Sequence, residues 1–299
     1  MLPVRSRPPN LAVFATASED SAEFDIADPE LVSMLEESQR RHFWFPARNR
    51  RILDFLRRDG VAPPARILEV GCGTGTVLSA LAGAGYAVTG IEMHERLARR
   101  AAEANPGSRI LALDLLHPPD ELLRLAPFDA VALFDVVEHL ESPGALLRAC
   151  AALVGDGGLV VGTVPALPVL WSDYDAYAGH RVRFVRKSLR RLLDGAGLPG
   201  ARTAYFFQSL TPGMLARRML VGRGAAASAD DAMRRAAQHA ALDAPGRAFN
   251  AAFAAACAAE SALARGVSLL DAVPGASLWF SMRIPPGSRA QRGDATHSA

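Results

Sequence analysis

Short apolar runs alternate with longer amphipathic segments through the middle of the chain. Runs rich in branched aliphatic residues predict β-strands, and they lie at Arg66–Val70, Ala87–Glu92, Ile110–Leu113, Phe128–Phe134 and Leu159–Val164. Segments with apolar residues at helical spacing lie at Thr76–Ala84, Glu95–Glu103 and Ala145–Leu153. A strand, helix, strand repeat at this spacing predicts an α/β fold, with helices on both faces of a parallel sheet.

The pattern continues less regularly toward the end of the chain. We expect a helix over Ser188–Ala196, a strand over Ala201–Gln208 and a last strand over Ser277–Met282, which makes seven strands. The alanine-rich stretch between the last two strands carries apolar residues at helical spacing, and it predicts a helical insertion.

These patterns divide the chain into five parts. Residues 1–27 mix proline, serine and acidic residues without periodicity, and we expect a flexible lead-in. Residues 28–62 predict two helices that cover the site. Residues 63–208 with 277–284 form the expected core, residues 209–276 the insertion and residues 285–299 a disordered tail.

Composition narrows the class of protein. Of 299 residues, 50% are hydrophobic and 21% charged, which is typical of a globular chain. The 33 basic and 31 acidic residues give a net charge of +2, without the strong basic excess of a DNA-wrapping protein, so we expect no nucleic-acid partner, although local basic patches stay open. Three distant cysteines favour neither a disulfide framework nor a metal site. Without a signal peptide or an apolar run long enough to span a membrane, we expect a cytoplasmic protein.

A glycine-rich turn follows the first predicted core strand. It reads Glu69-Val70-Gly71-Cys72-Gly73-Thr74-Gly75, and a helix follows at once. Glycines here let the backbone turn sharply and approach a ligand closely. A dinucleotide fingerprint needs Gly-x-Gly-x-x-Gly, but the third glycine comes one residue early. The Glu69 carboxylate would also repel a pyrophosphate, whereas it suits a ligand with an amine or a sulfonium.

This turn resembles the first motif of the class I S-adenosylmethionine-dependent methyltransferases. The resemblance covers Ile67 to about Leu198, and Val136-Val137-Glu138-His139 is similar to the ubiquinone-biosynthesis branch, which methylates small molecules. It implies a Rossmann-like, doubly wound sheet of seven strands whose last strand is antiparallel. It also implies S-adenosylmethionine as the cofactor and S-adenosylhomocysteine as its product.

The resemblance assigns the cofactor to the ends of successive strands. Glu69 and the glycine backbone would hold the methionine moiety, Glu92 the ribose hydroxyls, and Asp114 the adenine amine. Arg48 either pairs with the cofactor carboxylate or is solvated. The full set of expected cofactor residues is Arg48, Glu69, Gly71, Cys72, Gly73, Gly75, Glu92, Met93, Asp114, Leu115, Phe134, Asp135 and Val136.

The acceptor side of the site is expected to contain a base and aromatic walls. Methyl transfer to a hydroxyl needs a proton acceptor, and histidine is suited to this role. His139 and His180 follow the fourth and fifth predicted strands at the edge where such sheets bind ligands, although a purely structural role stays open for each. The expected acceptor walls are Trp44, Trp171, Tyr174 and Tyr177.

We therefore expect methylation of a small-molecule hydroxyl in a biosynthetic or secondary-metabolite pathway. A lipid-linked or carrier-linked acceptor is one alternative, and a non-catalytic protein that binds the cofactor is another. The insertion carries an apolar stripe that includes Phe249, Phe253 and Cys257. This stripe either packs over the acceptor pocket or contacts a membrane surface or a second copy of the chain.

Overall fold

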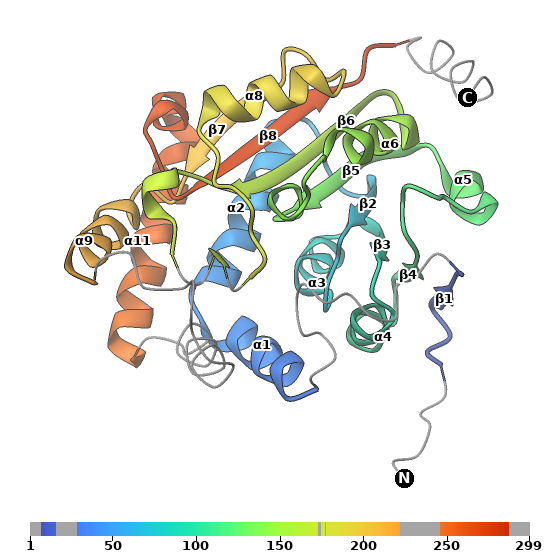
Figure 1. Ribbon diagram of the computed structural model, residues 1–299, viewed down its shortest axis with the longest axis horizontal. Helices are drawn as coiled ribbons and strands as arrows, with labels where there is room; N and C mark the ends of the chain where they lie inside the picture. Colours follow the sequence, from blue (N-terminus) through green and yellow to red (C-terminus); the bar gives the residue numbers. More distant parts are fainter. Residues whose placement is uncertain (1–6, 16–28, 173–174, 177, 222–245, 287–299) are drawn as a thin grey trace.

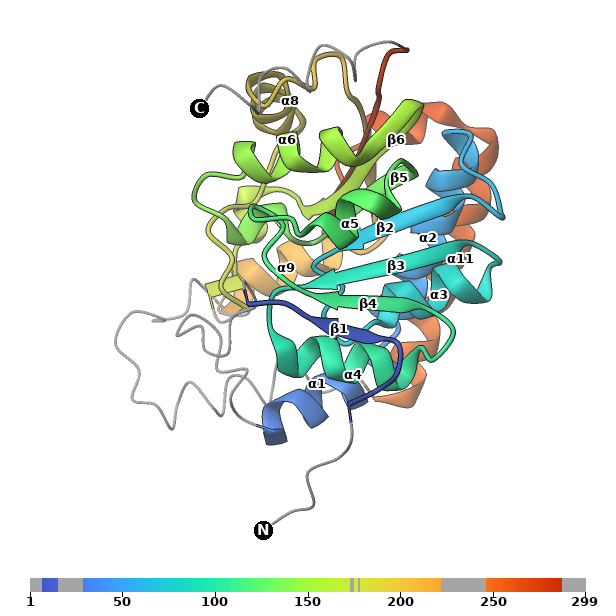
Figure 2. The same ribbon diagram turned by 90° about the vertical axis from the view of Figure 1, so that its right-hand side faces the viewer.

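A mixed eight-stranded sheet forms the centre of the molecule (Figures 1 and 2). The computed structural model describes residues 7–15, 29–172, 175–176, 178–221 and 246–286. The spatial order of the strands is β1-β4-β3-β2-β5-β6-β8-β7. Their bounds are β1 Leu11–Val13, β2 Arg66–Val70, β3 Ala87–Glu92, β4 Arg109–Ala112, β5 Phe128–Phe134, β6 Val154–Pro165, β7 Arg202–Phe206 and β8 Ser277–Arg283.

The strands β1 to β6 are parallel to one another wherever they pair. β2 lies at the centre and pairs with both β3 and β5, for example Ile67 with Val88 and with Ala130. The strands β2, β4 and β5 are almost entirely buried because helices cover both faces, which explains their continuous apolar runs. Their carboxyl ends meet at one edge, the usual position of ligand sites in such sheets.

The last strand is antiparallel, as the resemblance implied. β8 inserts between β6 and β7 and runs antiparallel to both. The aromatic ring of Trp279 on β8 is fully buried and stacks on Phe55, with ring centroids 4.9 Å apart. The α/β fold and the antiparallel strand predicted from the sequence are therefore confirmed.

The expected strand count was one too low, since β1 adds an edge strand within the stretch expected to be a flexible lead-in. It pairs in parallel with β4 (Figure 2). The side chain of Asn10 fixes it there by donating to the carbonyls of Ala102, Asn105 and Ser108 at 3.1, 3.0 and 2.8 Å. A strand of three residues is too short to show the alternation of polar and apolar residues that predicts a strand. The hydrogen bonds that hold it join residues far apart in the sequence, so they could not be predicted from the local sequence.

Helices cover the two faces of the sheet separately. One buried cluster takes side chains from α2, α3, α4 and α11, and the other takes side chains from α5, α6 and α8. The bounds are α1 Pro29–Arg41, α2 Trp44–Arg58, α3 Thr76–Gly83, α4 Glu95–Ala104, α5 Asp120–Leu125, α6 Gly144–Leu153, α8 Arg186–Gly195, α9 Thr211–Val221 and α11 Arg247–Gly266, with short 3₁₀ turns η1 Val137–His139, η2 Pro168–Leu170 and η3 Ser268–Ala272. The fold is thus doubly wound.

The stretch expected to be a helical insertion contains α9 and α11. Glu260 attaches α11 to the end of β7, because its carboxylate accepts the backbone N–H groups of Phe207 at 2.6 Å and Ser209 at 2.8 Å. This buried acid is therefore a structural contact between the insertion and the core. Among the helices that the structure describes, none is long and apolar enough to cross a membrane.

Candidate functional site

The glycine turn between β2 and α3 has a backbone that only glycine adopts readily. Gly71, Gly73 and Gly75 all have positive φ, at 72°, 55° and 84°. The Gly71 N–H donates to the carbonyl of Ile91 at 2.8 Å, which fixes the turn against β3. A Cβ at Gly73 would meet no atom within 4 Å, whereas one at Gly75 would lie 2.5 Å from Asn105. Gly73 therefore faces open space, and Gly75 packs against α4.

Glu92 connects this turn to the end of β3. Its Oε2 accepts the N–H of Gly73 at 2.9 Å, and its Oε1 accepts the N–H of His94 at 3.0 Å. A carboxylate has about four acceptor positions. Glu92 can therefore hold the turn and still accept hydrogen bonds from a ligand.

Glu69, the last residue but one of β2, is a buried acid without a complete set of hydrogen-bond partners. The side chain is 2% exposed, and Oε2 has no hydrogen-bond partner. Burial raises the pKa of Glu69 to about 8, a shift that Arg48 opposes and Glu92 reinforces. A cationic donor bound here would stabilise the ionised carboxylate.

Arg48 reaches into the same region from α2. Its Nη1 lies 2.5 Å from Oδ2 of Asp135, and its side chain is only 13% exposed. Asp135 itself has a positive φ of 56° and accepts the Thr163 hydroxyl at 2.9 Å. The Arg48 side chain is therefore largely buried and paired with Asp135 rather than solvated, and its contact with the cofactor carboxylate stays a prediction.

The residues expected around the adenine lie after β3 and β4. Asp114 accepts the N–H of Leu116 at 2.9 Å and pairs with His117 at 3.2 Å. Leu115 is buried and Met93 is exposed. The Cys72 thiol is buried, and burial raises its pKa. The contacts of these side chains with the cofactor stay predictions.

A cluster of two histidines and one acid lies where β5 and β6 end. Glu138 and His139 belong to η1, and the rings of His139 and His180 meet edge to face at 4.9 Å between centroids. Nε2 of His180 lies 3.9 Å from Oε1 of Glu138. The cluster thus brings together both predicted histidines and one acid outside the predicted set.

Burial shifts the pKa values of Glu138 and His139 in this cluster. Glu138 is fully buried, and neither of its oxygens has a hydrogen-bond partner. Burial, and then the charge of Asp135, raise the pKa of Glu138. Burial, and then His180, lower the pKa of His139 to about 4. The His139 ring is therefore neutral at ordinary pH.

Asp175 holds His180 from the other side of the ring. It lies 2.8 Å from Nδ1 of His180 and accepts Nε of Arg183 at 2.8 Å. Burial tends to raise the pKa of Asp175, but hydrogen bonds from His180 and Arg183 bring it below its usual value. An ionised carboxylate only accepts, so His180 carries its proton on Nδ1.

Glu138 and Asp175 were not among the predicted site residues. Glu138 precedes a predicted site histidine, yet an acid in a short turn is usually exposed. Asp175 lies five residues before His180 in a stretch without periodicity. Their burial follows from tertiary packing, which a single sequence does not display.

The predicted aromatic walls are only partly observed. Trp44 packs on Phe207 with 4.4 Å between ring centroids, and Trp171 is half-buried. Tyr174 and Tyr177 lie outside the described residues. The walls of the acceptor chamber therefore stay a prediction.

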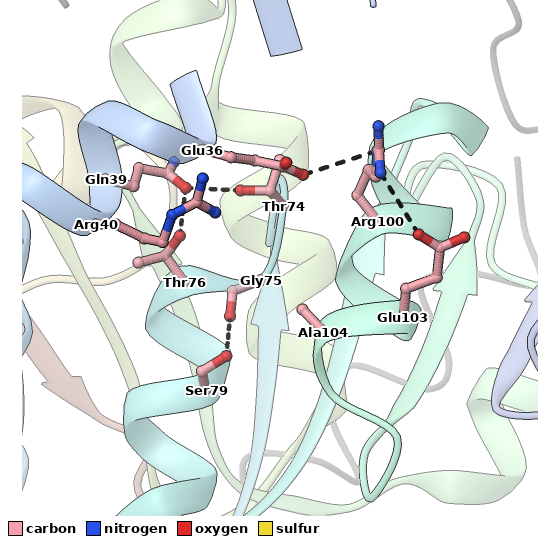
Figure 3. A pocket seen from close by; sticks show the side chains of 10 residues that line it. All are labelled: Glu36, Gln39, Arg40, Thr74, Gly75, Thr76, Ser79, Arg100, Glu103 and Ala104. Carbon is pink, nitrogen blue, oxygen red and sulfur yellow. Dashed lines mark hydrogen bonds and ion pairs between the residues drawn. The ribbon is translucent and has the colours of Figure 1, made fainter. Parts of the chain in front are cut away.

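A cavity of about 450 Å³ borders the outer side of the glycine turn (Figure 3). There Gln39 of α1 accepts the hydroxyls of Thr74 and Thr76 at 2.8 and 2.5 Å. Across the cavity, Arg100 lies between Glu36 and Glu103, 3.7 Å from each (Figure 3). This cavity shares only Gly75 with the predicted cofactor residues and does not include the acids at the strand ends. Its lining is Glu36, Gln39, Arg40, Thr74, Gly75, Thr76, Ser79, Arg100, Glu103 and Ala104.

Comparison with known proteins gives consistent similarities. A family model described as a methyltransferase domain matches residues 37–200. The ubiquinone biosynthesis O-methyltransferase of Xanthomonas campestris pv. campestris (strain B100) is 32% identical over 145 residues, which cover 48% of this chain and 61% of that protein. The protein of the same name from Xylella fastidiosa (strain 9a5c) is 36% identical over 115 residues, covering 38% and 47%. The chain thus spans less than two thirds of these relatives.

A solved structure resembles the fold over most of the chain. It belongs to the complex between the Haloferax volcanii Trm112 methyltransferase activator and a methyltransferase. The TM-score is 0.52 at 14% identity, over 90% of this chain and 100% of the matched one. At that identity the likeness supports the fold alone.

Proposed function

Because the chain belongs to the methyltransferase domain family, we propose that it is an S-adenosylmethionine-dependent methyltransferase acting on a small-molecule hydroxyl. The buried Glu69 carboxyl, with its unpartnered Oε2, carries the cofactor assignment. An amino-acid ammonium supplies the donor that this oxygen lacks. The open space beside Gly73 lets a ligand approach the backbone, so these residues fit the cofactor.

The remaining cofactor contacts follow from the strand ends. When bound, the cofactor supplies an electrophilic methyl group on a sulfonium. Glu92 would accept its ribose hydroxyls, and Asp114 its adenine amine, with Met93 and Leu115 beside the ring. Arg48 would lie near the methionine end, because it already pairs with Asp135 there.

The Glu138, His139 and His180 cluster supports a hydroxyl acceptor. In transfer to a hydroxyl, an O–C bond forms as the S–C bond breaks, the electron pair stays on sulfur, and the hydroxyl proton must leave. Removal of this proton depends most on His180, since Asp175 fixes its ring and its tautomer. Trp44 and Trp171 would enclose the acceptor, together with α9 and α11 as a lid.

A lipid-linked acceptor is a second candidate that one observation favours. The insertion exposes large apolar side chains, with Phe249 at 68%, Leu263 at 61% and Leu269 at 78%. Such residues contact lipid or another protein more favourably than water. Sedimentation with anionic lipid vesicles would distinguish the two acceptors, since a protein with a free small-molecule acceptor stays in the supernatant.

The central experiment labels the product. Purified protein and methyl-labelled S-adenosylmethionine are added to an extract of source-organism cells from which the gene has been deleted. We expect the acceptor to be in the cytoplasm and therefore in this extract. A labelled small molecule, with one S-adenosylhomocysteine formed per methyl group transferred, supports the proposal. Tight cofactor binding without S-adenosylhomocysteine would instead indicate a non-catalytic binding protein.

A further inference from the structure

Three side chains with ligand atoms converge at the edge of the sheet where β5 and β6 end. Glu138 and His139 come from η1, and His180 comes from the segment after β6. One ligand atom of each lies within 4.8 Å of the others. Ligand atoms that lie about 2 Å from one cation are roughly 3 to 4 Å apart, so small side-chain movements would bring these three atoms around one cation.

Glu138 points to a missing partner at this position. Its side chain is fully buried, and its two oxygens make no hydrogen bond. The 3.9 Å separation from Nε2 of His180 exceeds hydrogen-bonding distance. Burial of a carboxyl without a partner is unfavourable, and a bound cation would remove this cost.

Asp175 gives His180 the orientation typical of a metal ligand. The carboxylate binds Nδ1 at 2.8 Å, so Nε2 is the nitrogen that faces Glu138. Histidines that bind metals usually donate their other N–H to a carboxylate or a carbonyl in this way. Arg183 and Ser172 hold Asp175 in turn, each through a 2.8 Å contact.

We propose that Glu138, His139 and His180 bind a divalent transition-metal cation such as Mn²⁺ or Zn²⁺. Two imidazoles and one carboxylate favour these ions over Mg²⁺ and Ca²⁺, which prefer oxygen ligands. Three protein ligands leave coordination positions open for a substrate. The cation site replaces our expectation from the sequence that no metal is bound.

The proposal rests on the methyltransferase function and specifies its acceptor. A hydroxyl bound to the cation loses its proton to water more readily, because the positive charge stabilises the oxygen anion. That oxygen then forms the bond to the methyl carbon as the S–C bond breaks. On a six-coordinate ion such as Mn²⁺ three positions stay open, so the favoured acceptor class carries a second oxygen on the carbon next to the hydroxyl.

Metal binding is measured on the full chain without a histidine tag, after treatment with a chelator and dialysis. Co²⁺ is titrated and followed by visible absorption, and bound Mn²⁺ and Zn²⁺ are counted by elemental analysis. We expect one cation per chain. The affinity should fall roughly 100-fold or more in E138Q and H180N, and roughly 10- to 100-fold in D175N.

His117→Asn is the matched control, because it also removes a histidine that pairs with an aspartate, on the surface. Its metal affinity should equal that of the original protein. Thermal unfolding identifies any variant that fails to fold. If E138Q fails to fold, H180N still tests the proposal, because the His180 side chain is 11% exposed whereas that of Glu138 is fully buried. A chain that binds no cation, or E138Q and H180N proteins that bind it normally, overturn the proposal.

Cofactor binding and methyl transfer, measured in the same samples, separate the two proposals. If the cation binds but S-adenosylmethionine does not, the proposed function fails and the cation site stands. If methyl transfer continues unchanged with the cation removed, the cation has no role in the reaction, the inference about the acceptor fails, and His180 acts directly as the base.

Discussion

His180 donates from Nδ1 to the buried carboxylate of Asp175 across 2.8 Å. The same carboxylate accepts Nε of Arg183, so one acid orients a histidine and neutralises an arginine. Asp175 does not need to touch the acceptor to affect its chemistry. In the proposed reaction it would act through the position and the tautomer of the His180 ring.

Asp175→Asn should therefore reduce turnover more than cofactor binding. We expect kcat to fall roughly 10- to 100-fold, because the amide fixes the tautomer less well, with an unchanged Kd for S-adenosylmethionine. Stopped assays give kcat, and calorimetry gives the Kd. Ser172→Ala removes only one hydrogen bond to Asp175 and should change kcat less than about threefold. Equal losses in the two variants would contradict a specific role for the carboxylate.

His180→Ala should lower turnover by roughly 10²-fold or more, because it removes the ring on which proton removal depends. Cofactor affinity should stay within about twofold, since Glu69 and Glu92 are unaffected. Single-turnover assays with labelled cofactor measure the chemical step directly. A normal rate would exclude His180 from the reaction, and the same assay on H139A would then show whether His139 performs it.

The raised pKa of Glu69 predicts proton release on cofactor binding. Near pH 7 the free protein holds this carboxyl mostly protonated, since its pKa is about 8. A bound ammonium favours the ionised form, so binding should release close to one proton per chain, and affinity should rise with pH until about 8. Calorimetry in buffers of different ionisation enthalpy counts the protons.

Glu69→Gln should abolish this proton release and weaken cofactor binding. Glu95→Gln is the control, because Glu95 lies at the start of α4 and pairs with Arg99 at 3.1 Å. Proton release that persists in E69Q would assign it to another group.

The same shift makes unfolding dependent on pH. Because the pKa of Glu69 is higher in the folded state, its contribution to stability is complete below about 4.5 and is lost as pH rises through about 8. The slope reaches at most about 1.4 kcal/mol per pH unit. Without cofactor, E69Q should lose less stability than the original chain between pH 5 and 9 in denaturant titrations. Parallel curves would show that Glu69 does not cause the pH dependence.

Glu92→Ala should weaken cofactor binding by about 1 to 3 kcal/mol, the range for hydrogen bonds to a charged group. Since Glu92 also accepts the N–H of Gly73, Glu92→Gln is the more specific variant, because its amide oxygen can keep one of these bonds. We expect E92Q to bind more weakly than the original chain and more tightly than E92A. Unchanged binding in both variants would exclude Glu92 from the ribose site.

The sequence predicted the central strands well because both of their faces are buried. β5 was predicted with its observed bounds, since helices on each side require an unbroken apolar run. The glycine turn was also readable, because its φ values restrict the residue type. Glu138 and Asp175 were missed because long-range packing alone decides that these acids are buried, and the sequence around each is ordinary for an exposed turn.

Gly73 and Gly75 should respond differently to an added methyl group. Alanine at Gly73 meets no atom within 4 Å, so its structural cost is mainly that of positive φ, about 1 to 2 kcal/mol. Alanine at Gly75 would also lie 3.1 Å from Cα of Ala101 on α4 and 2.5 Å from Asn105. We therefore expect G75A to reduce the free energy of unfolding more than G73A does. In contrast, G73A should weaken S-adenosylmethionine binding at least roughly tenfold, because its methyl group enters the space where the cofactor approaches the backbone. Denaturant unfolding and calorimetry test both effects, and normal cofactor affinity in a folded G73A protein would place the cofactor elsewhere.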